Sequence, residues 1–174
     1  MLKSIVRNIV TAVTLIAGMQ WCHAGTGLVV EYGRTSEVTL FDTYFTSCRC
    51  GLVAGIDSLG RDTYVVALTY EDVAPETGEE VTFVMKNAGR VNLVAVDRVR
   101  RGDIKRRRFK NADITYVTRY YHIQWEDLLR LMEDDCKTLV LKTTGGELKY
   151  NIKDVKGVFN KLSNQLKIKQ LQLK

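Results

Sequence analysis

Hydrophobic residues near the end of the chain recur with the period of an α-helix in two separate segments. In the first, Trp125, Leu128 and Met132 fall on one helical face because their spacing is i, i+3 and i+7. The second segment repeats this spacing at Val155, Val158, Phe159, Leu162 and Leu166. Asp154 precedes the second run, and its carboxylate can accept a bond from a first-turn N–H group. The pattern predicts one helix from Trp125 and another from Val155.

Between these two helices the hydrophobic period changes to two, which is typical of β-strands. Two alternating runs flank a Gly-Gly dipeptide, and this arrangement predicts a tight hairpin because both glycines accept positive φ. We expect a register that pairs Leu141 with Tyr150. The same register places Lys142 opposite Lys149, a repulsion that only solvent exposure would make tolerable.

The preceding part of the chain shows the same alternation in a series of short runs. These lie at 28–30, 38–41, 62–70, 81–85, 90–99 and 114–122. The run 62–70 is apolar on both faces, so we expect it in the middle of a sheet. The segment 42–60 contains three glycines and is expected to be a loop, apart from a short strand at 52–54. The expected fold class is mainly β (α+β), an antiparallel β-sandwich or barrel with two helices near the C-terminus.

The first residues have the pattern of a signal peptide. Lys3 and Arg7 precede an apolar run, 9–19, that is too short for a stable membrane span, and a cleavage motif ends at Ala24. We therefore expect residues 1–24 to be removed, leaving a single β-rich domain, 25–174. The expected protein is bacterial, periplasmic or secreted, and has no transmembrane anchor.

Positive charge is concentrated in one segment. The chain has 26 basic and 20 acidic residues, a net charge of +6, and loss of Lys3 and Arg7 would leave 24 basic residues and +4. This balance is mild, so nucleic acid is not the expected partner. The local cluster consists of Arg98, Arg100, Arg101, Lys105, Arg106, Arg107, Arg108 and Lys110.

This basic cluster is the strongest candidate for a binding site. Arginine predominates in it, which suits bidentate contact with carboxylate or phosphate groups. We expect the partner to be another envelope or secreted protein, or an anionic envelope polymer. The alternative interpretation is that the cations only keep an exposed sheet edge from pairing with other chains.

Three cysteines follow the predicted cleavage site. Cysteines of exported proteins usually pair, but Cys48 and Cys50 are so close that a bridge between them would be strained. We therefore expect a disulfide between Cys136 and either Cys48 or Cys50. The remaining thiol has four interpretations: a buried free cysteine, an intermolecular bridge that makes a covalent dimer, a redox group or a metal ligand.

Catalytic groups are scarce in this sequence. His122 is the only histidine after the predicted cleavage site, so a histidine-based metal cluster is not expected. Neither a G-x-S-x-G motif nor a P-loop occurs. Cys48 or Cys50 with His122 would combine a nucleophile with a base, but a bridged cysteine cannot attack. We expect no catalytic residue, no metal and no cofactor, and therefore a protein that is not an enzyme.

Three functions are compatible with these observations. The first is an exported interaction protein that binds a protein or an anionic envelope component through the basic cluster. The second is a periplasmic inhibitor or immunity protein of a secreted hydrolase, since a rigid domain binds with little loss of entropy. The third is a thiol-redox or metal-handling protein that uses Cys48 and Cys50.

The C-terminal part of the chain also resembles a known family. Asp127-Leu128-Leu129 in a helix, Lys137-Thr138-Leu139 in a strand, a glycine turn and the closing segment Val155–Leu162 (VKGVFNKL) are similar to the invasion-associated locus B family of exported bacterial proteins. The resemblance implies a periplasmic or secreted β-sandwich. It supplies no catalytic residue.

Overall fold

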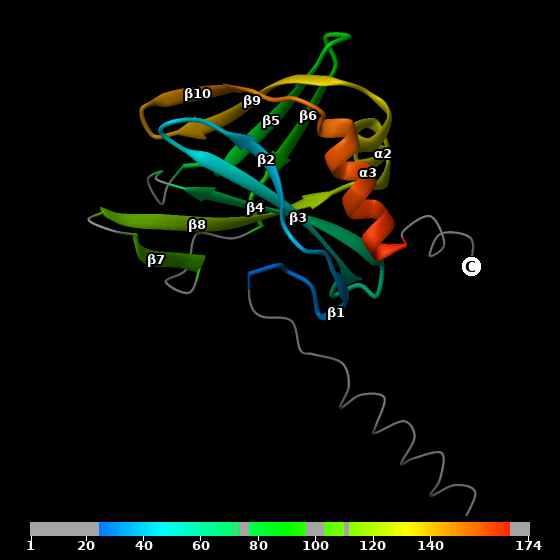
Figure 1. The fold of residues 1–174 in the computed structure, drawn as a ribbon. Helices are drawn as coiled ribbons and strands as arrows, with labels where there is room; N and C mark the ends of the chain where they lie inside the picture. Colours follow the sequence, from blue (N-terminus) through cyan, green and yellow to red (C-terminus); the bar gives the residue numbers. More distant parts are fainter. Residues whose placement is uncertain (1–24, 72, 74–76, 97–102, 110–111, 168–174) are drawn as a thin grey trace, which may run out of the picture.

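A computed structural model gives the fold of residues 25–71, 73, 77–96, 103–109 and 112–167. The predicted signal peptide, 1–24, lies outside these described residues. Within them, ten strands form two antiparallel sheets, which two helices accompany (Figure 1). The predicted fold class is confirmed, and the sheets curl into a half-barrel.

The larger sheet has six strands. They are β1 (Val30–Arg34), β2 (Val38–Asp42), β3 (Ser47–Ile56), β4 (Asp62–Glu71), β7 (Ile104–Phe109) and β8 (Ala112–Ile123). Their order is β1-β3-β4-β8-β7, and β2 pairs with β3 as β1 does. As predicted, β4 is central, and β7 is an edge strand.

The smaller sheet has four strands in the order β10-β9-β5-β6. They are β5 (Glu80–Met85), β6 (Arg90–Val94), β9 (Cys136–Thr143) and β10 (Gly146–Asn151). Just after β6, Ala95 forms an isolated antiparallel bridge with Tyr121 of β8. The two sheets therefore meet at this corner.

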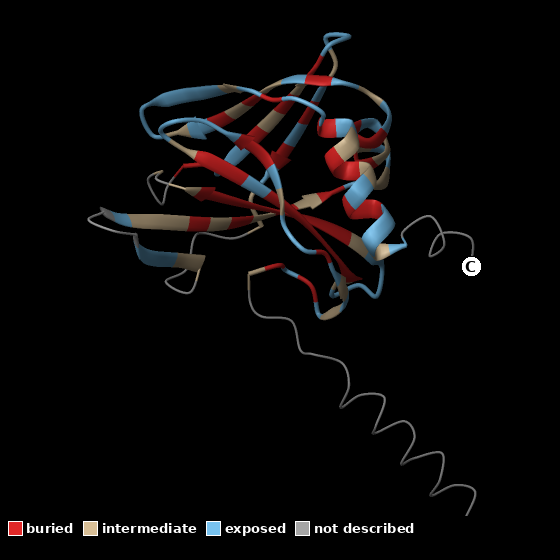
Figure 2. Ribbon diagram, in the orientation of Figure 1, coloured by how far each residue is buried: buried red, intermediate tan, exposed pale blue. Residues whose placement is uncertain are grey.

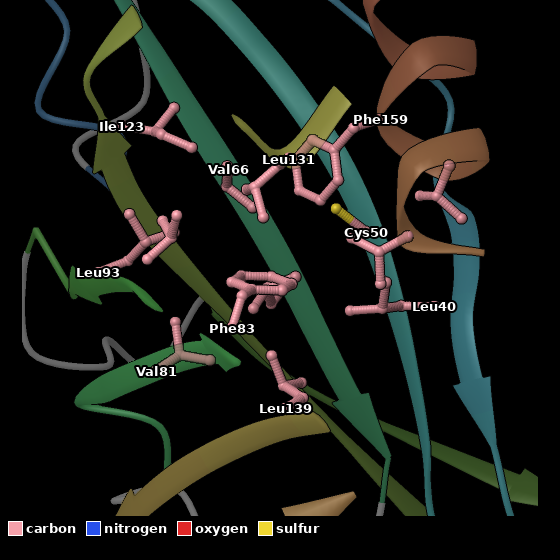
Figure 3. Packing of buried hydrophobic residues seen from close by; sticks show 14 of the residues in the cluster. Leu40, Cys50, Val66, Val81, Phe83, Leu93, Ile123, Leu131, Leu139 and Phe159 are labelled. Atoms are coloured by element: carbon pink, nitrogen blue, oxygen red, sulfur yellow. The ribbon is translucent and has the colours of Figure 1, made fainter. Parts of the chain in front are cut away.

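The main hydrophobic core lies between the two sheets and the helices. Buried residues are concentrated in β3 and β4 of the larger sheet and on alternate positions of β5 and β9 (Figure 2). Phe83 of β5 packs edge-to-face on Phe159, with ring centroids 5.8 Å apart, and both rings are fully buried (Figure 3). The helical stripe predicted from sequence thus faces the interior.

The helices are α2 (Trp125–Glu133) and α3 (Val155–Leu166). Their starts match the prediction, and Asp154 caps α3 by accepting a bond from the Gly157 N–H at 3.1 Å. α3 packs against α2, β2 and β3. Neither helix is long and apolar enough to cross a membrane, and this statement covers the described residues alone.

The segment 42–60, predicted to be mostly loop, differs from the prediction because most of it is a strand. Strand β3 runs through Ser47–Ile56 and pairs with β1, β2 and β4. One of its glycines, Gly55, marks the close approach of another backbone: a Cβ there would lie 2.1 Å from the Val30 carbonyl oxygen. Glycine inside a strand often has this role, and here it lets β1 lie directly against β3.

The predicted register of the β9–β10 hairpin is wrong. Leu141 pairs with Leu148, and Lys142 pairs with Glu147. The turn is tighter than expected, because Gly146 already belongs to β10 and pairs with Thr143. Since the shift is even, the apolar face is preserved, and the expected repulsion between lysines is replaced by a pair of opposite charge.

Candidate functional site

The structure places the centre of the predicted basic cluster on strand β7. Lys105, Arg106, Arg107 and Arg108 are consecutive and all exposed, and they form the pale-blue part of β7 in Figure 2. The other members of the cluster, Arg98, Arg100, Arg101 and Lys110, lie outside the described residues. The described part of the cluster is therefore a run of four cations on one edge strand.

The four cations are divided between the two faces of the sheet. Side chains alternate along a strand, so Lys105 and Arg107 share one face while Arg106 and Arg108 share the other. Arg108 stands opposite Asp113 of β8 in the antiparallel register. An extended ligand lying along β7 would therefore meet positive charge on both of its sides.

The charge of β7 is not used within the described fold. No ion pair joins residues 105–108 to another residue that the structure describes. Elsewhere in the described fold some cations pair and others do not: Arg34 binds Glu31 at 2.8 Å and Lys142 binds Glu80 at 2.7 Å, whereas Lys153 forms no ion pair with a described residue. A row of unpaired like charges repels itself and does not stabilise the strand, so either a ligand or protection of the sheet edge would account for it.

The cationic strand belongs to a ribbon that extends past the body of the sheet. The pairing of β8 with β4 ends where Tyr116 meets Glu71. Beyond that point, residues 112–115 of β8 pair with β7 alone. In Figure 1 this ribbon lies on the side away from α2 and α3. The outer edge of β7 pairs with no other described strand.

The predicted disulfide is absent, and this prediction is corrected here. Cys48, Cys50 and Cys136 are all free and buried. Cys48 and Cys50 lie on the same face of β3, with Cys50 near Leu40 in the core (Figure 3). Cys136 begins β9 and is buried there. The three residues fill the core as small apolar side chains, a common role of free cysteine.

Burial also makes these thiols poor nucleophiles. Loss of solvent raises the pKa of Cys48 and Cys50 far above the ordinary range, and it raises the pKa of Cys136 to about 12. Thiol chemistry requires the thiolate, which is scarce at such values. Within the described part of the chain, no group of three or more His, Cys, Asp or Glu side chains could hold a metal ion.

A second candidate site is a hollow where β8 ends and α2 begins. Its volume is about 570 Å³. Four segments meet there: Gly27, the β3–β4 turn, the start of β4, and the junction from β8 to α2. The residues used below are Asp57, Arg61, Asp62, Tyr64, His122, Trp125 and Glu126, all of which line it.

Asp57 makes one wall of this hollow rigid. Its Oδ1 accepts bonds from the backbone N–H groups of Leu59 and Arg61, at 2.8 and 3.0 Å. Its Oδ2 binds the guanidinium of Arg61, with the Nη2 atom at 2.8 Å. The backbone bond from Arg61 is the main reason that the pKa of Asp57 lies below its ordinary value. The carboxylate therefore closes the turn and holds Arg61.

His122 lines this hollow and is half-buried near the end of β8. Burial lowers its pKa, and the nearby Asp57 only partly opposes this effect, so His122 is neutral at pH 7. Gly27 has φ +69, and a Cβ there would approach His122 Nε2 to 2.9 Å. The glycine thus keeps the imidazole open to the hollow.

Ser58 also lines the hollow, so the residue types of a hydrolytic triad are present. Such a triad requires a hydrogen bond from serine to histidine and another from histidine to the carboxylate. Neither bond occurs here: no hydrogen bond joins Ser58 to His122, and Asp57 accepts its bonds from Leu59 and Arg61 instead of from His122. The arrangement is a polar hollow whose lining includes the aromatic rings of Tyr64 and Trp125.

The sequence did not reveal this hollow, because its lining comes from segments far apart in the chain. The available signal was the strand–helix junction, where His122 and Trp125 lie within one turn of each other. The chain matches no protein-family model, no curated protein and no solved structure.

Proposed function

We propose that this protein is a non-enzymatic interaction protein, exported from a bacterial cell, that binds an acidic segment of another protein along strand β7. The observation that carries the proposal is the exposed run of four cations, residues 105–108, on an edge strand. Such an edge offers unpaired backbone groups to a partner strand. The pattern of residues 1–24 supports a site of action outside the cytoplasm.

The alternation of the cations favours an added strand over a globular acidic surface. A peptide paired with β7 would direct successive side chains to opposite faces. Lys105 and Arg107 would meet acidic residues on one face, and Arg106 and Arg108 would meet them on the other. A rigid surface patch would reach only one of these faces. Backbone pairing and charge would thus act together.

The competing interpretation is that the cations protect the edge of the sheet. Lysine and arginine on an edge strand prevent pairing with other copies of the chain. That interpretation predicts that no acidic peptide adds to β7, and that removing the charge promotes self-association. Both interpretations use the same residues, so a binding experiment has to separate them.

The test uses a fluorescent peptide, EETEETEE, and the full chain. Fluorescence anisotropy would measure its affinity for the unaltered chain and for the triple variant Arg106→Gln, Arg107→Gln, Arg108→Gln. Loss of three cations from the binding edge should weaken binding about tenfold or more at low salt. Added salt should weaken binding to the unaltered chain, because exposed charges are screened.

Two controls determine what a loss of affinity means. The triple variant Lys153→Gln, Lys156→Gln, Lys161→Gln removes the same charge from exposed positions elsewhere and should bind normally. The peptide EEPEEPEE has the same charge, but proline cannot donate to a strand ladder, so it should bind weakly. Equal affinity for both peptides would contradict strand addition. No binding of either peptide would favour edge protection.

A further inference from the structure

We infer that the hollow at the β8–α2 junction binds a positively charged group, an ammonium or guanidinium, on a small molecule or a peptide side chain. This site is separate from β7 and does not depend on the function proposed for it. The hollow measures about 570 Å³, which lies within the range of about 300–1,000 Å³ usual for ligand pockets. It can hold a substituted amine together with part of its carrier.

The hollow is negative in a chain that is positive overall. Three carboxylates and one guanidinium line it, those of Asp57, Asp62, Glu126 and Arg61. With His122 neutral, these groups sum to −2, whereas the whole chain has a net charge of +6. A local reversal of sign concentrates ligands of the opposite charge, here cations.

The carboxylates of this hollow are not equivalent. The Asp57 carboxylate forms an ion pair with the Arg61 guanidinium, with Oδ2 and Nη2 2.8 Å apart. This pair uses both groups, so neither is the main partner of a ligand. Asp62 receives a long bond, 3.4 Å, from the Tyr32 hydroxyl. Neither Asp62 nor Glu126 forms an ion pair with a described residue. These two carboxylates are therefore the groups that can accept bonds from a cation.

Trp125 supplies an aromatic ring in the lining of the hollow, and cations are attracted to such rings. Its ring packs on Tyr64, with centroids 5.8 Å apart and planes tilted by 41°, and Tyr64 is itself buried. The indole is thus held in place at the hollow before any ligand arrives. Indole is the strongest of the aromatic side chains in cation–π contact. An aromatic ring beside two carboxylates that form no ion pair with a described residue matches an alkylammonium or alkylguanidinium group.

The positive end of the α2 dipole lies at the same corner and would favour an anion. Glu126 in the first turn opposes that effect, as acidic residues at helix starts do. The decisive comparison is therefore between ligands of the same shape and different charge. A neutral sugar is the other ligand that rings and carboxylates commonly bind, and it has to be included.

The test is a fluorescence titration of the full chain with Trp21→Phe, which leaves Trp125 as its one tryptophan. The probes are butylammonium, butylguanidinium, the neutral isostere butylurea, the anion butyrate, and N-acetylglucosamine. The two cations should shift the emission in a saturable way. Butylurea should bind at least about tenfold more weakly than either cation. Stronger binding of butyrate, butylurea or the sugar than of the cations would overturn the inference, as would the absence of saturable binding by either cation.

Charge-neutral variants test the assignment to residues. Asp62→Asn and Glu126→Gln should each weaken butylguanidinium binding several-fold, about threefold or more. Glu133→Gln, at the other end of α2, removes the same charge outside the hollow and should have no effect. Equal urea midpoints would show that the variants remain folded. Unchanged affinity in both Asp62→Asn and Glu126→Gln would refute the site.

Discussion

Two buried tyrosines form a hydrogen-bonded chain in which the two members are not equivalent. The Tyr121 hydroxyl donates to the Gly78 carbonyl oxygen at 2.5 Å and lies 3.1 Å from the Tyr70 hydroxyl. Because the one hydroxyl hydrogen of Tyr121 is used on Gly78, Tyr70 must be the donor in the second bond. Both side chains are fully buried, so water cannot replace a lost partner. The chain links the larger sheet to the segment that enters the smaller one.

This asymmetry fixes the size and sign of the effects of mutation. Tyr121→Phe leaves two buried groups without partners, the Tyr70 hydroxyl and the Gly78 carbonyl, and each costs about 1–3 kcal/mol. The free energy of unfolding should then fall by about 2–6 kcal/mol. Tyr70→Phe removes a donor but leaves the bond from Tyr121 to Gly78 intact, so its cost should be about 0.5–1.5 kcal/mol.

The double variant gives the sharpest test. In the Tyr121→Phe background the Tyr70 hydroxyl is an unsatisfied donor, so adding Tyr70→Phe should raise the free energy of unfolding by about 1 kcal/mol. Urea unfolding followed by circular dichroism would measure all four proteins. Tyr44→Phe, at a side chain that is 95% exposed, is the neutral control. Equal destabilisation by Tyr70→Phe in both backgrounds would refute the directed chain.

Three further predictions concern the buried thiols, the imidazole and the helix cap. Cys48, Cys50 and Cys136 should resist iodoacetamide in the folded chain and react after unfolding in urea, as peptide mass spectrometry would show; a bridged peptide would contradict the structure. The NMR titration of His122 should have its midpoint below the ordinary pKa of 6.5, because burial lowers it. As the pH falls through 6.5, the His122 imidazole is protonated in the unfolded chain before it is protonated in the folded chain. This favours the unfolded chain, so the urea midpoint should decrease. Asp154→Ala should lower the free energy of unfolding by about 1 kcal/mol, whereas Asp154→Asn should leave it nearly unchanged because it retains the cap.

The periodic parts of the chain could be predicted because their burial is regular. The helices from Trp125 and Val155 each bury one stripe, and β4 is buried on both faces, so the sequence period matches the period of the structure. Asp154 was recognisable as a cap from its position alone, since few residue types fit that place. Local rules were sufficient for these elements.

Strand β3 and the disulfide could not be predicted by such rules. In β3, Gly55 is required by the approach of β1, a contact between segments that local composition does not show. The expected bridge rested on the habit of exported cysteines to pair. In the fold, Cys48 and Cys50 face the core and Cys136 packs against Met85, with the two sulfur atoms 2.9 Å apart. The cysteines therefore serve as core side chains, although their residue type alone had suggested a disulfide.

The two candidate sites differ in how far the sequence could reveal them. The cations of β7 are consecutive, so composition alone identified residues 105–108, although only the sheet order showed that they lie on an edge. The hollow combines Asp57 and Asp62, near the start of β4, with Glu126 in α2. Strand β4, the β5–β6 hairpin, β7 and β8 separate these two parts in the chain. Its negative charge exists only after folding has brought those parts together.

Strand β8 connects the two sites and predicts that they act independently. Arg107 stands opposite Ile114 near one end of β8, while His122 lies near the other end. Eight residues at about 3.3 Å each separate Ile114 from His122, a distance of about 26 Å. That is more than twice the Debye length of about 10 Å at 0.1 M salt, so a cation bound in the hollow cannot noticeably alter the field at β7. Saturating butylguanidinium should therefore leave the affinity for EETEETEE unchanged at 0.1 M salt. A change of more than about threefold would mean that the strand transmits a conformational difference between its ends, because screened charge alone could not produce it.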